Sequence, residues 1–265
     1  MTRILVPTDF SSTANNAVKY AAAFCKDNKY KMILLNVMHV PAIDVNVAAG
    51  ALNDLMESQK AEVDVKLNKA AKELGSEFKI EIETLSKFGL GADVIVQESN
   101  ENDVLITIMG THGASGIFDA LLGSVSNAVV KRSEVPVIVL PKGSVYSTIK
   151  KVAFAYDYKE KITHELEFVH ELNPSKDVKI DIISVEPDRV EGTFEEEVVA
   201  DKDGVKEVSL WAYNVQDGIN YYAEKENVNM IGLKRHQRSF IENLFHKSTT
   251  KELLNNSSIP MIVFN

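Results

Sequence analysis

An internal repeat constrains the fold more strongly than any other feature of this sequence. The stretch RILVPTDFS (Arg3–Ser11) is echoed by KVAFAYDYK (Lys151–Lys159), and each is a short apolar run that ends in an aspartate. VPVIVLP (Val135–Pro141) is echoed in the same way by IPMIVFN (Ile259–Asn265). A repeat of this length indicates one structural unit used twice along the chain.

The repeat divides the 265 residues into two predicted domains, residues 1–141 and residues 150–265. The short polar stretch between them, residues 142–149, is predicted to be a linker. Each domain is long enough to bury a hydrophobic core of its own.

Short apolar strands alternate with amphipathic helices in the first domain, and this alternation indicates a mostly parallel sheet. The run DVLITIMG lacks a strict polar alternation, as expected for a strand that is covered on both faces. The prediction is two tandem, open, mostly parallel five-stranded α/β sandwich domains of Rossmann-like type. Strands are expected at Ile4–Pro7, Met32–Val37, Ile80–Leu85, Val104–Met109 and Val135–Leu140, and helices at Ser11–Lys26, Asn53–Leu74, Asp93–Asn100 and from about Ser124.

The second domain is shorter than the first. Where the first domain has its long helix, the second has an acidic stretch, Glu186–Trp211, for which we expect a solvated loop or a hairpin.

Charge and composition exclude several classes of function. A formal net charge of −9 disfavours binding to nucleic acid and to anionic membranes. Cys25 is the one cysteine, so neither an internal disulfide nor a zinc motif is expected. The amino-terminal apolar run stops at Asp9, and no run reaches the 18 or more residues of a membrane span, so we expect a cytoplasmic protein.

The stretch MGTHGASGIFDALLGS (Met109–Ser124) carries the clearest chemical signal. It joins the carboxyl end of a predicted strand to the start of a helix, where free N–H groups and the helix dipole favour an anion. Its glycines allow a ligand to approach the backbone closely, although any single one of them is also explained by a turn or by tight packing. The spacing matches neither a P-loop nor the GxGxxG dinucleotide motif.

The spacing Gly110-x2-Gly113-x9-Gly123-Ser124 resembles the glycine signature of the universal stress protein family. The stretches ILVPTDFS and KRSEVPVIVLP are also similar to that family, and the resemblance covers nearly the whole chain as a tandem member. It implies an adenine nucleotide, ATP, AMP or ADP, as the ligand, and Mg²⁺ can arrive with the nucleotide phosphates.

The resemblance also implies the residues of the nucleotide site. Asp9, beside Pro7 and Thr8, is expected on the adenine side, Val37 in the adenine pocket, and Met109 and Gly110 by the ribose. The residues expected to wrap the phosphates are Thr111, His112, Gly113, Gly123, Ser124, Val125 and Ser126.

The second domain departs from this pattern in its corresponding loop, Ile231–Thr250. Matching Gly232 to Gly110 and Ser248 to Ser124 makes this loop longer, with 16 positions in place of 14. We therefore expect the second nucleotide site to be lost or altered, with Tyr156 and Tyr158 crowding its adenine side. The basic residues between Lys234 and Lys247 leave two interpretations open, an anion site made by side chains and a solvated or partner-binding surface.

The leading functional hypothesis is a regulatory, nucleotide-binding stress protein with its nucleotide in the first domain only. The alternatives are a weak ATPase or nucleotidyl-transfer enzyme on the same fold and a nucleotide-independent interaction module. No catalytic residue is assigned, because no general base or arginine finger is evident. Family members pair through their last strands, so Val135–Leu140 and Ile259–Phe264 are expected to pair within the chain, and a further homodimer is left open.

Overall fold

The computed structural model describes residues 2–40, 49–101, 103–111, 123–155, 162–175, 177–202, 204–234 and 259–265. The first half contains β1 (Arg3–Pro7), α1 (Ser12–Asn28), β2 (Lys31–Met38), α2 (Ala49–Phe78), β3 (Ile82–Phe88), α3 (Gly91–Glu101), β4 (Val104–Gly110), α4 (Ser124–Arg132) and β5 (Val137–Leu140). The second half contains β6 (Lys151–Ala155), α5 (Thr163–His170), β7 (Lys179–Pro187), β8 (Glu195–Lys202), β9 (Val205–Ala212), α6 (Val215–Lys225), β10 (Met230–Lys234) and β11 (Met261–Phe264).

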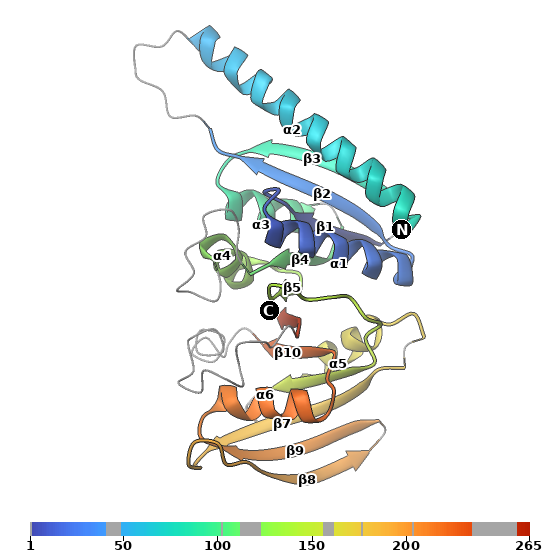
Figure 1. Ribbon diagram of the computed structural model, residues 1–265, viewed down its shortest axis with the longest axis vertical. Coiled ribbons are helices and arrows are strands. Elements are labelled where there is room, and N and C mark those ends of the chain that lie inside the picture. The colour runs from blue at the N-terminus through green and yellow to red at the C-terminus, as the bar shows by residue number, and fades with distance from the viewer. Residues whose placement is uncertain are drawn as a thin grey trace.

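All of these strands form one 11-stranded sheet, in the order β3-β2-β1-β4-β5-β11-β10-β6-β7-β9-β8 (Figure 1). Strands within each half are parallel, except that β8 runs antiparallel to β9 at the outer edge. The halves meet where β5 and β11 pair antiparallel, with Ile138 opposite Ile262. The predicted pairing of the last strands is therefore confirmed, and each strand covers what would be an exposed edge of the other half.

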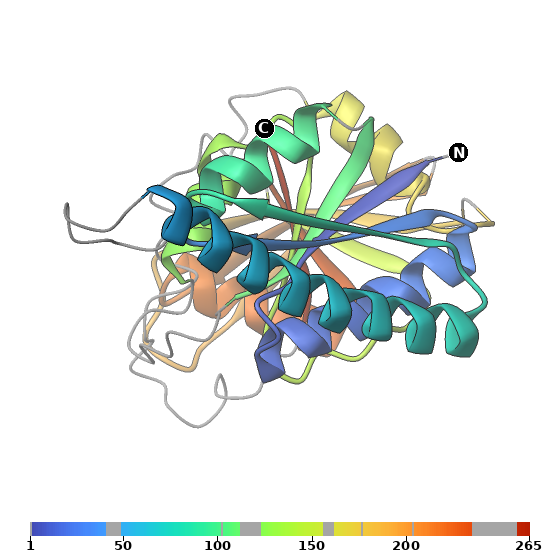
Figure 2. The same ribbon diagram turned by 90° about the horizontal axis from the view of Figure 1, so that it is seen from above.

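Helices cover both faces of the sheet, as the view from above shows (Figure 2). Buried residues of α1, α2 and α5 belong to one core cluster, and those of α3, α4 and α6 belong to the other. Successive strand residues pack alternately into the two clusters: Ile4 and Val6 belong to one, and Leu5 belongs to the other. This two-sided burial explains why the strands lack a polar alternation.

The first helix shows how sequence fixes an element. Ser11 caps α1 by accepting a hydrogen bond from the Ala14 N–H at 3.1 Å, and Lys29 ends it in the left-handed conformation at φ 58°. The predicted helix is confirmed with small shifts at its ends. The long helix α2 exceeds its prediction at both ends, and in Figure 1 it extends past the neighbouring strands.

In the part of the second half that the structure describes there are six strands, one more than predicted. Its acidic stretch forms the β8–β9 hairpin, so of the two expected forms the structure has the hairpin. The sequence of β8, EEEVVADK, is rich in charge, which suits an edge strand that must not recruit another chain. Among the described residues, no helix is both long enough and apolar enough to cross a membrane.

The segment predicted as a linker, residues 142–149, packs along α1, and we call it the strap. Asn16 Nδ2 donates to the carbonyl of Ser144 at 3.0 Å near the start of the helix. Tyr146 donates its hydroxyl to Asp27 Oδ2 at 2.9 Å near the end, and its ring packs edge-on against Tyr20. The strap therefore holds the second half to α1 in addition to the β5–β11 pairing.

Candidate functional site

The strand order has a switch point at β1 and β4, and we call the region beyond the carboxyl ends of these two strands the crevice. In the sheet, β1 lies between β2 and β4, so the chain leaves β1 in one direction and reaches β4 from the other. In open α/β sheets, ligands bind at such a switch point beyond the carboxyl ends of the strands. Residues after β1, residues after β4 and the start of α4 meet there, and these are the elements in which the sequence predicts the nucleotide site.

The turn after β1, residues 8–11, is fixed by its own hydrogen bonds, and we call it the Asp9 turn. The Phe10 N–H donates to Thr8 Oγ1 at 3.1 Å, and the Ser11 N–H donates to Asp9 Oδ1 at 3.0 Å. Phe10 adopts the left-handed conformation, with φ 61°. Thr8 is buried and Asp9 is exposed, so the turn presents a carboxylate at the surface beside the crevice.

The end of β4 and the start of α4 form the other wall. The Gly123 N–H donates to the Thr111 carbonyl at 2.6 Å, and the Thr111 N–H donates to the Leu140 carbonyl at 3.0 Å. Ser126 Oγ donates to the Gly110 carbonyl at 2.9 Å in a buried position. These bonds hold the first turn of α4 directly against the last residue of β4.

Among the described residues, the amino terminus of α4 has no side-chain cap. Gly123 is its N-cap residue and, having no side chain, makes no side-chain capping hydrogen bond to the first turn. Ser124 and Val125 are exposed there. Uncapped N–H groups combined with the positive end of the helix dipole attract phosphate or carboxylate oxygens.

Gly110 lets α1 approach the crevice closely. A Cβ atom at this position would lie 2.9 Å from Thr13 Cγ2 and 3.3 Å from the Thr13 carbonyl oxygen. Any side chain at position 110 would therefore have to displace the first turn of α1, which explains a glycine at this point of the signature.

The predicted site residues that the structure describes lie at the carboxyl ends of β1, β2 and β4 and at the start of α4, but several of their side chains point away from the crevice. Val37, half-buried, and Met109, 5% exposed, direct their side chains into the core cluster beneath α3 and α4. The hydroxyl of Ser126 donates to the Gly110 carbonyl, so its side chain stabilises the wall of the crevice. The predicted residues His112 and Gly113 lie outside the described residues, while those that the structure describes are Pro7, Thr8, Asp9, Val37, Met109, Gly110, Thr111, Gly123, Ser124, Val125 and Ser126.

One buried polar residue beside the Asp9 turn was missed from the sequence. Asn36 is 7% exposed in β2, and its Nδ2 donates to the Thr8 carbonyl at 2.7 Å. A polar residue inside the apolar run KMILLNVM was the available signal.

Strand register corrects the alignment of the second half. Gly110 pairs with Leu140 in the first half, and Lys234 pairs with Phe264 in the second. Since VPVIVLP and IPMIVFN equate Leu140 with Phe264, Lys234 stands in the place of Gly110. The predicted match of Gly232 to Gly110 was wrong by two residues.

Gly232 instead lies in the middle of β10, where the ring of Phe154 covers it. A Cβ atom at Gly232 would lie 2.4 Å from Phe154 Cδ2, so a glycine is needed here to make room for the Phe154 ring in the core. The prediction aligned Gly232 with Gly110 because both are glycines, whereas the hydrogen-bonded register of the strands aligns Lys234 with Gly110.

The corrected register also removes the predicted difference in loop length. Fourteen positions separate Gly110 from Ser124, and fourteen separate Lys234 from Ser248. In sequence, the three glycines of the signature are then replaced by Lys234, Gln237 and Lys247. Residues 235–258 lie outside the described residues, so this comparison beyond Lys234 rests on sequence alone.

Lys234 changes the chemistry of this position. Its Nζ lies 2.9 Å from Glu165 Oε1 of α5, with side chains that are 18% and 10% exposed. A largely buried salt bridge therefore stands in the second half where the first half has bare backbone beside α1.

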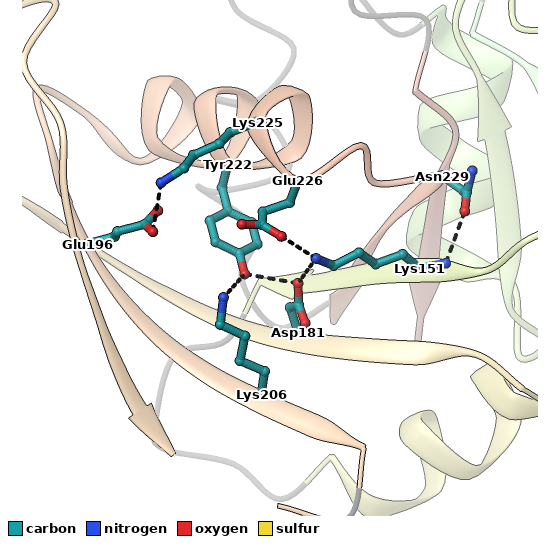
Figure 3. Close-up of polar contacts among 8 residues, drawn as sticks. All are labelled: Lys151, Asp181, Glu196, Lys206, Tyr222, Lys225, Glu226 and Asn229. Carbon is teal, nitrogen blue, oxygen red and sulfur yellow. Dashed lines mark hydrogen bonds and ion pairs between the residues drawn. The ribbon is translucent and has the colours of Figure 1, made fainter. Parts of the chain in front are cut away.

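A second group of polar side chains lies at the opposite ends of the strands, between α6 and the sheet (Figure 3). Lys151 Nζ lies 2.8 Å from Asp181 Oδ2 and 2.5 Å from Glu226 Oε2. Tyr222 donates its hydroxyl to Asp181 Oδ2 at 2.9 Å and accepts a hydrogen bond from Lys206 Nζ at 3.4 Å. Opposite charges compensate one another here, so the network holds α6 to the sheet.

Protonation of this network follows from its contacts. The hydrogen bond from Lys151 holds the pKa of the Glu226 carboxyl below its usual value. Burial opposes the charge on Lys151, but its hydrogen bonds to Asp181 and Glu226 outweigh burial and raise the pKa of Lys151. Burial and the hydrogen bond to Asp181 raise the pKa of Tyr222, which keeps this hydroxyl protonated.

Comparison with known proteins agrees with the resemblance seen in the sequence. The model of the universal stress protein family matches residues 1–141 and 147–265. Universal stress protein MJ0577 of Methanocaldococcus jannaschii is 33% identical over 153 residues, which cover 53% of this chain and 94% of that protein. Universal stress protein Slr1230 of Synechocystis sp. is 25% identical over 290 aligned positions, which cover 100% of both chains.

A solved structure shows the same fold over nearly the full length. The universal stress protein of Archaeoglobus fulgidus DSM 4304 has a TM-score of 0.67 and 21% identity, covering 99% of this chain and 96% of its own. With the family model matched in both halves and relatives aligned over one half and over the whole length, the chain belongs to the universal stress protein family.

Proposed function

We propose that this protein is a regulatory protein of the stress response that binds one adenine nucleotide, ATP, ADP or AMP, in its first half only. The observation that carries the proposal is the difference at one strand position. Gly110 leaves backbone beside an uncapped helix terminus, whereas Lys234 fills the same position with a salt bridge to Glu165.

The first half has the donors that a phosphate group needs. The exposed first turn of α4 supplies N–H groups and the hydroxyl of Ser124, and Gly123 leaves that turn without a side-chain cap. The carboxylate of Asp9 is exposed after the neighbouring strand β1, and we propose that it accepts hydrogen bonds from a base or a ribose. We propose that Mg²⁺, where present, is carried in by the phosphates.

The second half is much less suited to binding an anion at this position. For a phosphate to use the place of Gly110 there, it would have to compete with Glu165 for Lys234, and the released carboxylate would repel it. The two halves therefore differ in the groups that they offer to a phosphate. We infer that the second half has a structural role and binds no nucleotide.

The signature glycines provide the test. Gly113→Val places a branched side chain within the signature, and Gly116→Val places the same side chain in the same loop outside it. Isothermal titration with ATP should show at least about a tenfold loss of affinity for the first variant and little change for the second. Equal affinities for the two variants, with circular dichroism unchanged, would refute the phosphate site. Turnover measured in the same samples separates a binding protein from a weak ATPase.

A further inference from the structure

Asn36 is a buried amide at the end of an apolar strand, directly beneath the crevice. Its neighbours in β2, Leu34 and Leu35, are almost fully buried, and Asn36 itself is 7% exposed. A buried amide is costly unless it is hydrogen-bonded, and Asn36 Nδ2 donates to the Thr8 carbonyl at 2.7 Å. The position therefore has a specific polar partner outside its own strand.

This hydrogen bond extends the pairing of β1 with β2 by one step. The last residues in register are Pro7 and Leu35, and the Thr8 N–H still donates to the Leu35 carbonyl at 2.8 Å. The next link comes from the Asn36 side chain to the Thr8 carbonyl. Thr8 is consequently tied to β2 through both its N–H and its C=O.

The Asp9 turn begins at this anchored residue. Within the turn, the Phe10 N–H and the Ser11 N–H donate to the side chains of Thr8 and Asp9. On the side of α1, Asn15 Nδ2 donates to the Phe10 carbonyl at 3.2 Å. On the side of the sheet, both the N–H and the carbonyl of Thr8 are hydrogen-bonded to β2. On the side of β2, the position of the Asp9 turn thus depends on the contact that Asn36 makes with Thr8.

We propose that Asn36 is a positioning residue that holds the Asp9 turn in the orientation required for the nucleoside part of the ligand. The proposal rests on the proposed nucleotide function of the crevice. Asn36 acts through Thr8 and Asp9 and has no contact with phosphate in this scheme, so it governs recognition of the nucleoside and leaves binding of the phosphates unchanged.

The second half has a different residue at the position that corresponds to Asn36. The register of Lys151 with Lys179 repeats that of Arg3 with Lys31, and counting along the strands puts Ser184 in the place of Asn36. Ser184 is also buried, at 6% exposed, but a serine side chain is shorter and has no amide. This difference agrees with a nucleoside site in the first half and provides a matched control position.

The experiment compares Asn36→Leu with Ser184→Ala. Titration calorimetry measures the affinity for ATP and for inorganic tripolyphosphate, and NMR measures hydrogen exchange of the Phe10 and Ser11 amides without ligand. For Asn36→Leu we expect ATP affinity to fall about tenfold, tripolyphosphate affinity to stay within about twofold, and both amides to exchange faster. Ser184→Ala should match the wild type in all three measurements.

Two results would overturn the proposal. One is unchanged ATP affinity and unchanged amide exchange in Asn36→Leu, and the other is an equal loss of affinity for ATP and tripolyphosphate. If the wild type binds no ATP, the proposed function fails, and the exchange measurement decides the role of Asn36 alone. Faster exchange at Phe10 and Ser11 then supports its role in positioning the turn, and unchanged exchange refutes it.

Discussion

A methyl group added at Gly110 tests how tightly the chain packs beside the crevice. In Gly110→Ala the new Cβ would lie 2.9 Å from Thr13 Cγ2 and 3.3 Å from the Thr13 carbonyl oxygen. Favourable contacts between carbon atoms lie near 3.5–4.0 Å, so the first turn of α1 has to move. Overpacking of this kind costs about 1–3 kcal/mol. We therefore expect the free energy of unfolding to fall by that amount in urea denaturation.

Removing the opposing methyl group should relieve the strain. Thr13→Ser deletes Cγ2 and leaves the 3.3 Å contact with the carbonyl oxygen, so we expect the double variant to recover part of the lost stability. A coupling energy of about 0.5–2 kcal/mol between the two positions is the expected result of the double-mutant cycle. Additive effects, or a Gly110→Ala protein as stable as the wild type, would refute the close approach of α1 to β4.

Two further predictions concern the second half and the strap. Because the pKa of Glu226 is lowered on folding, its contribution to stability is present above its unfolded value of about 4.5 and is lost as the pH falls through the lowered value. Glu226→Gln should lower the urea midpoint at pH 7 by more than at pH 3, whereas Glu224→Gln, at an exposed neighbour, should shift neither. Tyr146→Ala removes packing against α1, so it should lower the free energy of unfolding by about 2 kcal/mol or more and speed the reaction of buried Cys25 with a thiol reagent. Val145 is 83% exposed, so Val145→Ala should leave both the free energy of unfolding and the reaction rate unchanged. Equal effects of the paired variants would contradict either prediction.

The repeat and the apolar runs in the sequence predicted the mostly parallel α/β architecture of both halves. Short apolar runs around Ile4, Ile108 and Ile138 form strands because the pattern of two-sided burial is local and continuous. The pairing of the two last strands followed from the resemblance to the family and is confirmed by Ile138 opposite Ile262. Features of this kind depend on stretches of several residues, so small local errors do not change them.

Details that depend on one residue, on strand register or on an added strand were not accessible from the sequence. Gly232 and Lys234 are two positions apart, and only the hydrogen-bonded register of β10 shows which of them stands in the place of Gly110. The added strand β8 pairs through backbone groups, which its charged sequence does not reveal. Asn36 is polar in an apolar run, yet its meaning depends on the carbonyl of Thr8 on another strand.

Photolabelling with 8-azido-ATP, followed by peptide mapping of the full-length chain, tests the central claim most directly, because it reports both the number and the place of bound nucleotides. We predict one label per chain at saturation, on peptides within residues 1–141, and competition of the label by ATP. Equal labelling of both halves, or labelling confined to residues 150–265, would contradict the assignment of the nucleotide site to the first half.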